Sequence, residues 1–183
     1  MHLRTLEDLG DLGGRRVLVR ADLNVPLASG GVADDFRIRA TLPTLREILD
    51  RGASLVVASH LGRPKTEEDH AKYSMAPVRE YLAGLVADDR ITVLENTRFN
   101  PGETKNDPGY AAELADGCDL YVNDAFGSAH RAHSSTEGVA RLLPAYAGLL
   151  LLDELENLGK LLTDDIERWN PDILHLHSPY FPP

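Results

Sequence analysis

The sequence predicts an α/β fold: a Rossmann-like, doubly wound parallel sheet in three α/β/α layers, forming a single domain. Two observations support this prediction. First, short apolar runs typical of strands alternate with stretches whose apolar residues recur at helical spacing, along most of the 183 residues. Second, the runs are apolar through their centres, as in parallel strands covered on both faces. Such an alternation favours a parallel sheet with right-handed crossovers.

The first strand is expected at Arg16–Arg20, and the loop after it contains Pro26 and two glycines, which oppose regular structure. A helix follows Asp34 and Asp35 and ends at Gly52. Its apolar residues recur at helical spacing, and its proline is expected in the first turn or at a kink. The apolar residues are Ile38, Leu42, Leu45 and Leu49, and the proline is Pro43.

Four further strands and their helices are expected in the same alternation, with polar loops after the strands. The strands are Ser54–Ser59, Ile91–Leu94, Leu120–Asn123 and Ala147–Leu151. The helices start at Ser74 or Met75 and run to about Val86, then Pro108–Leu114, Ser135–Leu143 and Asp153–Leu162.

Composition limits the classes of partner. The net charge of −10 opposes binding to nucleic acid or to an anionic membrane, because both need a basic face. The single cysteine, Cys118, excludes a disulfide within the chain, which fits a cytoplasmic protein. The acidic N-terminus is not expected to be a signal peptide, and no apolar run reaches the length of a membrane span.

Cations follow four of the predicted strands. Arg20 ends the first strand, His60 and Arg63 follow the second, and Arg98 follows the third. If the strands are parallel, these loops leave one edge of the sheet, where open α/β sheets bind ligands. Arg37, at the start of the first helix, faces the same edge. We therefore expect a local cationic patch suited to a small phosphorylated or carboxylated ligand.

The fourth strand leads into the densest group of polar residues, in the stretch Val122–Thr136. It carries His130, Arg131 and His133 on a loop between a strand's carboxyl end and the next helix. Backbone donors and the positive helix end favour an anion at such a place. A solvated basic loop is the alternative interpretation of this stretch.

Other chemistries have weaker support. His130 and His133 could ligate zinc, but there is a single cysteine and no HExxH, so no metal site is predicted. Cys118 is expected to be a small buried residue rather than a nucleophile. Neither GxxxxGK[ST] nor GxGxxG occurs, so no nucleotide fingerprint is present.

Seven stretches, in order and over nearly all of the chain up to Leu162, resemble the N-terminal domain of phosphoglycerate kinase. They are RADLNVPL (Arg20–Leu27), DFRIRATLPTL (Asp35–Leu45), SHLGRPK (Ser59–Lys65), KYSMAPV (Lys72–Val78), LENTRFNPGE (Leu94–Glu103), YVNDAFGSAHRAHSST (Tyr121–Thr136) and ELENLGKLL (Glu154–Leu162). The resemblance implies a glycolytic kinase that transfers a phosphoryl group between 1,3-bisphosphoglycerate and ADP, giving 3-phosphoglycerate and ATP. In that family, which is usually monomeric, this domain holds the phosphoglycerate, a second domain binds MgATP or MgADP, and a hinge brings them together.

The resemblance also implies roles for individual residues. Asp22 and Asn24 would meet the hydroxyl and carboxyl end of the glycerate. Arg37 is the residue expected to touch the transferring phosphoryl group, so it is the candidate catalytic residue. The implied substrate-binding residues are Asp22, Leu23, Asn24, Arg37, His60, Leu61, Gly62, Arg63, Arg98 and Arg131, and the rest of the basic patch is Arg20, His130 and His133.

The sequence also departs from the family pattern. Near residues 86–91 it is shorter by a strand-and-helix unit. After residue 162 it reads TDDIERWNPDILHLHSPYFPP, a divergent tail (163–183) in which no regular structure is expected. The family's nucleotide-binding domain, and with it any residues for MgATP, is not expected in this chain.

Three hypotheses therefore stay open. The chain is the acid-binding half of a phosphoglycerate kinase, or a module that binds 3-phosphoglycerate without turnover, or a fragment that pairs with a separately encoded nucleotide domain.

Overall fold

The computed structural model describes residues 3–168, with side chains to residue 160. The chain divides into two compact units, Met1–Leu152 and Asp153–Pro183. The first unit holds the sheet, and the described part of the second is the continuation of helix α6 (Leu149–Arg168). No described helix combines the length and the apolar character needed to cross a bilayer.

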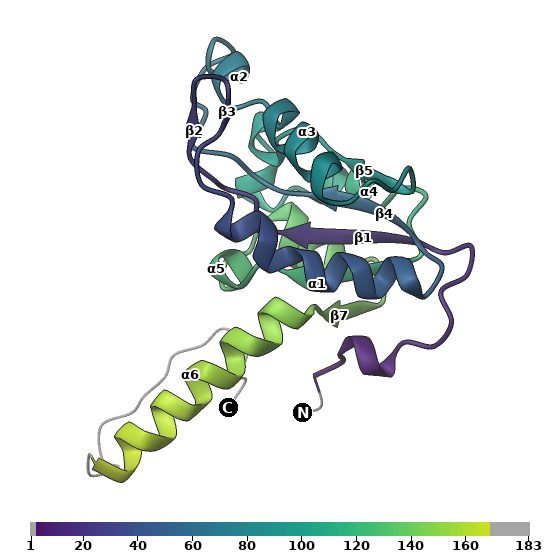
Figure 1. Cartoon of the computed structure of the whole chain (residues 1–183), viewed down its shortest axis with the longest axis vertical. Coiled ribbons are helices and arrows are strands. Elements are labelled where there is room, and N and C mark those ends of the chain that lie inside the picture. Colours follow the sequence, from purple (N-terminus) through teal and green to yellow (C-terminus); the bar gives the residue numbers. More distant parts are fainter. Residues whose placement is uncertain (1–2, 169–183) are drawn as a thin grey trace. The chain divides into compact units, whose positions relative to one another are not determined.

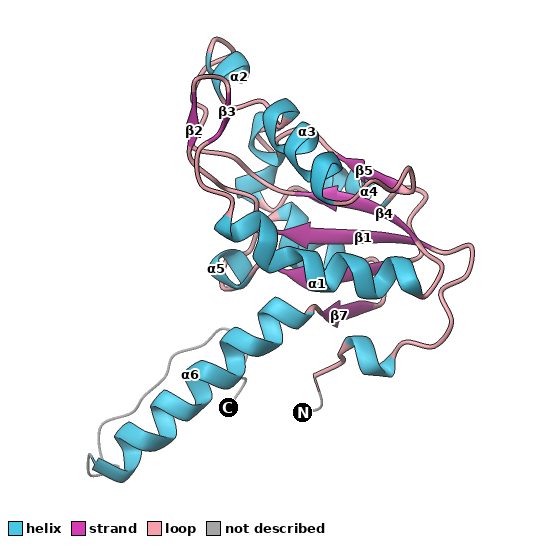
Figure 2. Ribbon diagram, in the orientation of Figure 1, coloured by secondary structure: helices cyan, strands magenta, loops and turns pink. Residues whose placement is uncertain are grey.

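Five parallel strands form the sheet, in the order β5-β4-β1-β6-β7 (Figures 1 and 2). The predicted parallel α/β fold is thus confirmed. The strands are β1 (Arg16–Ala21), β4 (Ser54–Ala58), β5 (Ile91–Val93), β6 (Leu120–Asp124) and β7 (Ala145–Ala147). A small antiparallel hairpin joins β2 (Leu27–Ala28) to β3 (Gly31–Val32).

Alternate residues of the central strands face two separate cores. In β1, Val17 and Val19 belong to the larger core, while Leu18 belongs to the smaller one. The larger core receives α1 (Phe36–Asp50) and α3 (Ala76–Leu85). The smaller core receives α4 (Pro108–Ala115) and Val139. The helices of the two cores therefore cover opposite faces of the strands, as predicted, and Figure 1 shows α1 running alongside β1.

Short helical elements complete the fold; all but the first, which precedes β1, lie in loops that follow a strand of the sheet. They comprise α2 (Asp69–Lys72), α5 (Phe126–Ala129), the 3-10 turns η1 (Leu6–Asp8), η2 (Thr97–Phe99) and η3 (Glu103–Lys105), and the π-helical turn η4 (Ser134–Gly138).

Three predicted elements differ from the structure in their bounds. The strand expected at Ala147–Leu151 is β7, which ends at Ala147, and the last helix already begins at Leu149. That helix continues to Arg168, so the tail expected to lack regular structure from residue 163 is helical for its first residues; residues 169–183 lie outside the described part. The helix expected at Ser135–Leu143 is present only over its first part, as the π-helical turn η4 followed by two α-helical residues.

Pro43 lies inside α1 rather than in its first turn. Gly52 follows the helix with φ of +89°, the left-handed conformation that glycine adopts at little cost.

Candidate functional site

A cavity of about 300 Å³ lies where the loops after the strands meet. Each of β1, β4, β5 and β6 sends residues to it through the loop that follows, and α1 contributes from its first turn. This is the ligand-binding edge of an open parallel sheet. The lining residues are Asp22, Asn24, Arg37, His60, Gly62, Arg63, Arg98, Gly127, Ser128 and Arg131.

Eight of the ten residues predicted to bind substrate therefore line one cavity. Among the described lining residues there are four arginines and one carboxylate, so the cavity is cationic inside a chain of net charge −10. That carboxylate, Asp22, forms an ion pair with Arg37, whose side chain is 51% exposed. The predicted local basic pocket in an acidic protein is thus present.

Gly62 shapes one wall of the cavity. Its N–H donates to Asn24 Oδ1 at 2.8 Å, which fixes the Asn24 side chain. Gly62 has φ of +59°, and a Cβ there would lie 2.2 Å from Tyr73 Cε1. Only glycine fits at this point, because any side chain would both strain the backbone and collide with the Tyr73 ring.

Arg98 lies in η2, and hydrogen bonds to its backbone and to its side chain hold it in place. Asn96 caps this turn by accepting from the Arg98 N–H at 3.1 Å, and its amide donates to Leu61 O at 2.7 Å. Arg98 Nη1 donates to Gly62 O at 2.8 Å. Burial lowers the pKa of the Arg98 guanidinium, and nearby Arg131, Arg20 and Arg63 lower it further. An anion bound here would relieve that repulsion.

His60 lies among the same charges. Burial is the largest cause that lowers its pKa to about 2, and the positive charges of Arg20, Arg98 and Arg131 add to the effect. The imidazole is therefore neutral at physiological pH and serves as a hydrogen-bonding group rather than as a cation.

Five of the predicted site residues do not line the cavity. The side chains of Leu23 and Leu61 belong to the larger core. Arg20 is buried behind His60, to which its Nη2 donates at 2.8 Å. His130 is exposed and accepts from Arg131 Nε at 3.3 Å. The last of the five, His133, is only 12% exposed and lies beside Glu103. The assignment of Arg20, His130 and His133 to the rest of the basic patch stays a prediction; Arg20 is buried and His133 is partly buried.

Two lining residues were not predicted, Gly127 and Ser128. They lie in the polar stretch Val122–Thr136, but neither carries charge, so a prediction based on cations does not include them. Sequence gave no signal for the buried carboxylate of Glu103, 1% exposed, which lies close to the site's buried arginine.

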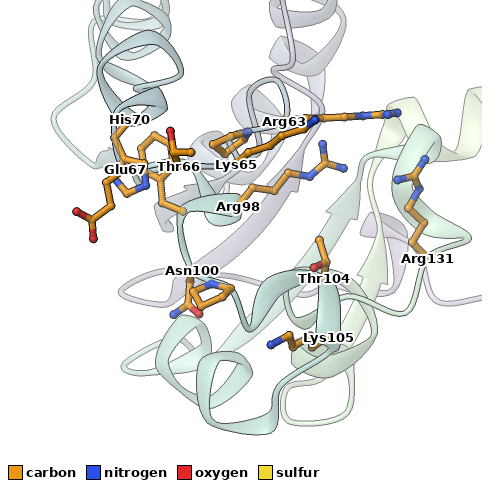
Figure 3. A pocket seen from close by; sticks show the side chains of 13 residues that line it. Arg63, Lys65, Thr66, Glu67, His70, Arg98, Asn100, Thr104, Lys105 and Arg131 are labelled. Carbon is orange, nitrogen blue, oxygen red and sulfur yellow. The ribbon is translucent and has the colours of Figure 1, made fainter.

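A second, larger cavity of about 660 Å³ adjoins the first. Arg63, Arg98 and Arg131 line both cavities. Figure 3 shows these three side chains reaching toward a common space from separate loops, with Lys105 on the opposite side. The arginines are thus accessible from two directions.

No group of three or more His, Cys, Asp and Glu residues suited to a metal ion occurs within residues 3–168. His130 and His133 therefore lack the further ligands that a zinc site needs in this part of the chain.

Comparisons with known proteins give a consistent result. The family model described as phosphoglycerate kinase matches residues 6–89 and 85–169. The phosphoglycerate kinase of Rubrobacter xylanophilus is 50% identical over 88% of this chain and 46% of its own length. That of Moorella thermoacetica is 48% identical over 87% of this chain and 46% of its own length. The chain thus spans about half the length of the curated relatives it matches.

Solved structures agree with the sequence matches. The phosphoglycerate kinase of Coxiella burnetii superimposes with a TM-score of 0.81 at 35% identity, covering 87% of this chain and 45% of that one. The enzyme of Pyrococcus horikoshii OT3 superimposes with a TM-score of 0.74 at 29% identity, covering 86% and 45%.

Proposed function

Because the chain belongs to the phosphoglycerate kinase family, we propose that its cationic cavity binds 3-phosphoglycerate or 1,3-bisphosphoglycerate and supplies the acid-binding half of that kinase reaction. One observation carries the proposal: four arginines from four separate segments line a single cavity of about 300 Å³. That volume is at the lower end of the range of about 300–1,000 Å³ usual for small-molecule sites.

The chemistry of the reaction suits these residues. The acceptor is a carboxylate, whose oxygen attacks the γ-phosphorus of ATP while the bond to ADP breaks. A carboxylate is already a nucleophile, so no proton has to be removed. Catalysis then consists of orienting the acid and stabilising the charge of the transferring group, which is work for arginines.

Arg37 is the proposed catalytic residue, because it lies at the exposed mouth of the cavity, with its side chain 51% exposed. In a complete enzyme, or with a nucleotide domain added in trans, we expect Arg37→Ala to lower kcat by about 10²–10³-fold, the usual cost of losing one donor to developing charge. Steady-state kinetics with 3-phosphoglycerate and MgATP measure this. A kcat within twofold of the wild type would remove Arg37 from the catalytic role.

The nucleotide substrate has no evident place in the described residues. The described sequence lacks a phosphate-binding glycine loop, and residues 3–168 contain no cluster suited to a metal ion. We therefore propose that MgATP or MgADP is held outside this part of the chain, on a separate nucleotide domain. The 183-residue chain assayed by itself is expected to bind the acid without ATP-dependent turnover.

Calorimetric titration with 3-phosphoglycerate tests the binding proposal. Arg63→Ala and Arg131→Ala remove exposed arginines of the cavity, so the fold should tolerate both. Each is expected to weaken binding about 10–100-fold, because a hydrogen bond to a charged group contributes about 1.5–3 kcal/mol.

Arg141→Ala is the matched control, since Arg141 is 74% exposed and pairs with Glu137 away from the cavity residues. It should leave the Kd unchanged. Binding of unphosphorylated glycerate as tightly as 3-phosphoglycerate, or equal losses in all three variants, would contradict the proposal.

A further inference from the structure

Arg20 is a buried cation in the middle of the sheet. It is 1% exposed and follows Leu18 on the face of β1 that contacts the smaller core. Its guanidinium donates to Ser135 Oγ from Nε at 2.9 Å, to Ala21 O from Nη1 and to His60 Nδ1 from Nη2 at 2.8 Å. A charge this deeply buried needs a compensating partner.

Glu103 is that partner, and Ser135 connects the two charges. Glu103 is 1% exposed at the start of η3, and it raises the pKa of Arg20 against the larger, lowering effect of burial. Ser135 Oγ accepts from Arg20 and donates to Glu103 Oε1 at 2.6 Å, while the Ser135 N–H donates to Glu103 Oε2 at 3.0 Å. The Ser135 hydroxyl thus accepts one hydrogen bond and donates another at the same time.

The π-helical turn η4 places Ser135 in the interior. Ser134, Ser135 and Thr136 are all buried, although hydroxyl residues after a strand usually lie at the surface. Tyr121 Oη donates to Ser135 O at 3.0 Å, which fixes the turn against β6. Widened turns of this kind are frequent at functional sites.

The hydrogen bond from Arg20 decides the tautomer of His60. A guanidinium carries only donors, so His60 Nδ1 must accept and therefore has no proton. The proton of a neutral imidazole then resides on Nε2. Because His60 lines the cavity, this Nε2–H is available to an oxygen of a bound anion.

We propose that Glu103 and Ser135 are positioning residues, which hold Arg20 in the interior so that Arg20 keeps His60 in the Nε2–H tautomer at the cavity. The contacts from Glu103 to His60 are independent of the proposed function. Only the further step, in which the Nε2–H donates to a phosphate or carboxylate oxygen, rests on the proposed function. The other charged and titratable groups that act on His60 are Arg98, Arg131 and His133, and His133 Nδ1 lies 3.8 Å from Glu103 Oε1.

Long-range ¹H–¹⁵N spectra of the histidine rings test the proposal directly. In the wild-type chain, His60 should be the Nε2–H tautomer at pH 7 and should stay unprotonated down to pH 5. In Glu103→Gln and Ser135→Ala, Arg20 loses its anchor, so its hydrogen bond to His60 Nδ1 should weaken and His60 should become a mixture of the Nδ1–H and Nε2–H tautomers. Glu156→Gln, the control at the exposed ion pair with Lys160, should match the wild type.

Titrations with 3-phosphoglycerate on the same samples separate this inference from the proposed function. Binding is expected to weaken about tenfold in Glu103→Gln and Ser135→Ala, the usual effect of one lost hydrogen bond. If the wild type has the Nε2–H tautomer but binds no 3-phosphoglycerate, the network stands and the proposed function fails.

A wild-type His60 in the Nδ1–H tautomer overturns the inference, as do identical His60 tautomer populations in all four chains. If Glu103→Gln and Ser135→Ala unfold at too low a temperature to be studied, the His60 tautomer of the wild type decides alone. The Nε2–H tautomer supports the inference, and the Nδ1–H tautomer overturns it.

Discussion

The cations around the cavity repel one another. The pKa of Arg98 is lowered by burial and then by Arg131, Arg20 and Arg63. Like charges held this close raise the free energy of the empty cavity, and an anionic ligand removes that cost. The ion pair between Asp22 and Arg37 offsets it only in part.

The neutral state of His60 makes stability depend on pH. Its pKa in the folded chain is about 2, against an ordinary 6.5, so below pH 6.5 the unfolded chain takes up a proton that the folded chain does not. Stability is therefore complete above pH 6.5 and falls as the pH is lowered toward 2. Between pH 8 and 5 the loss from His60 should be about 2 kcal/mol.

Urea titrations of the wild type and His60→Gln at pH 8 and 5 measure this loss. Carboxyl groups such as Asp69 and Asp119 have lowered pKa values and do not titrate in that window. His60→Gln should therefore show a smaller decrease in unfolding free energy than the wild type. An identical decrease in both chains would mean that His60 is not held neutral.

The sequence predicted which residues line the cavity better than it predicted which charged side chains are buried. The position of His60, Arg63 and Arg98 after strand ends was enough to place them together. Arg20 also follows an apolar run, but the alternation of side chains along β1 turns it to the inside. Its burial depends on Glu103, which is far away in sequence, so no local pattern could reveal it.

At the scale of elements, the apolar runs predicted where the strands lie, but they did not predict where the last strand ends and the last helix begins. The run around Ala145–Leu152 suits a buried strand or a buried helix equally, and periodicity cannot distinguish them. The structure assigns it to both, with α6 beginning at Leu149. Contacts to α1 and β6 decide this: Thr44 Oγ1 accepts from Leu149 N at 3.0 Å, and Asp124 Oδ1 accepts from Leu150 N at 3.0 Å.

Thr44→Val should therefore weaken the start of α6. Thr44 Oγ1 also donates to Asp124 Oδ1 at 2.9 Å, so the variant removes one buried and one partly buried hydrogen bond at nearly constant volume. We expect a loss of about 1–3 kcal/mol in unfolding free energy and faster hydrogen exchange at the Leu149 amide.

Thr41→Val is the matched control for this change. Thr41 is equally buried on the same helix, but its hydroxyl only donates to Arg37 O within α1, at 3.2 Å. It should cost less and leave the Leu149 amide unaffected. Equal costs and equal exchange rates in the two variants would contradict the capping role of Thr44.

At the scale of the whole molecule, an acidic chain carries a cationic cavity. The net charge of −10 repels anions at long range, while the cavity attracts a small anion that can enter it. This combination is expected to favour a small anion over a polyanion, because a polymer would also meet the net negative charge of the rest of the chain.

The affinity for 3-phosphoglycerate should therefore depend on salt concentration, because salt screens the arginines of the cavity. Raising NaCl from about 50 to 300 mM screens the arginines and is expected to increase the Kd for 3-phosphoglycerate several-fold. Calorimetry at three salt concentrations measures this effect, with duplex DNA as a comparison that should not bind at any of them. A Kd independent of salt would indicate that the arginines do not dominate recognition.

The most direct test of the central claim is to locate the ligand on the folded chain. Backbone ¹H–¹⁵N spectra recorded during titration with 3-phosphoglycerate should show shifts concentrated at the cavity, at the amides of Asn24, His60, Gly62, Arg98, Gly127 and Arg131. Shifts centred elsewhere, such as on α3 and the β2–β3 hairpin, or no shifts at millimolar ligand, would contradict the claim that these loops form one anion site.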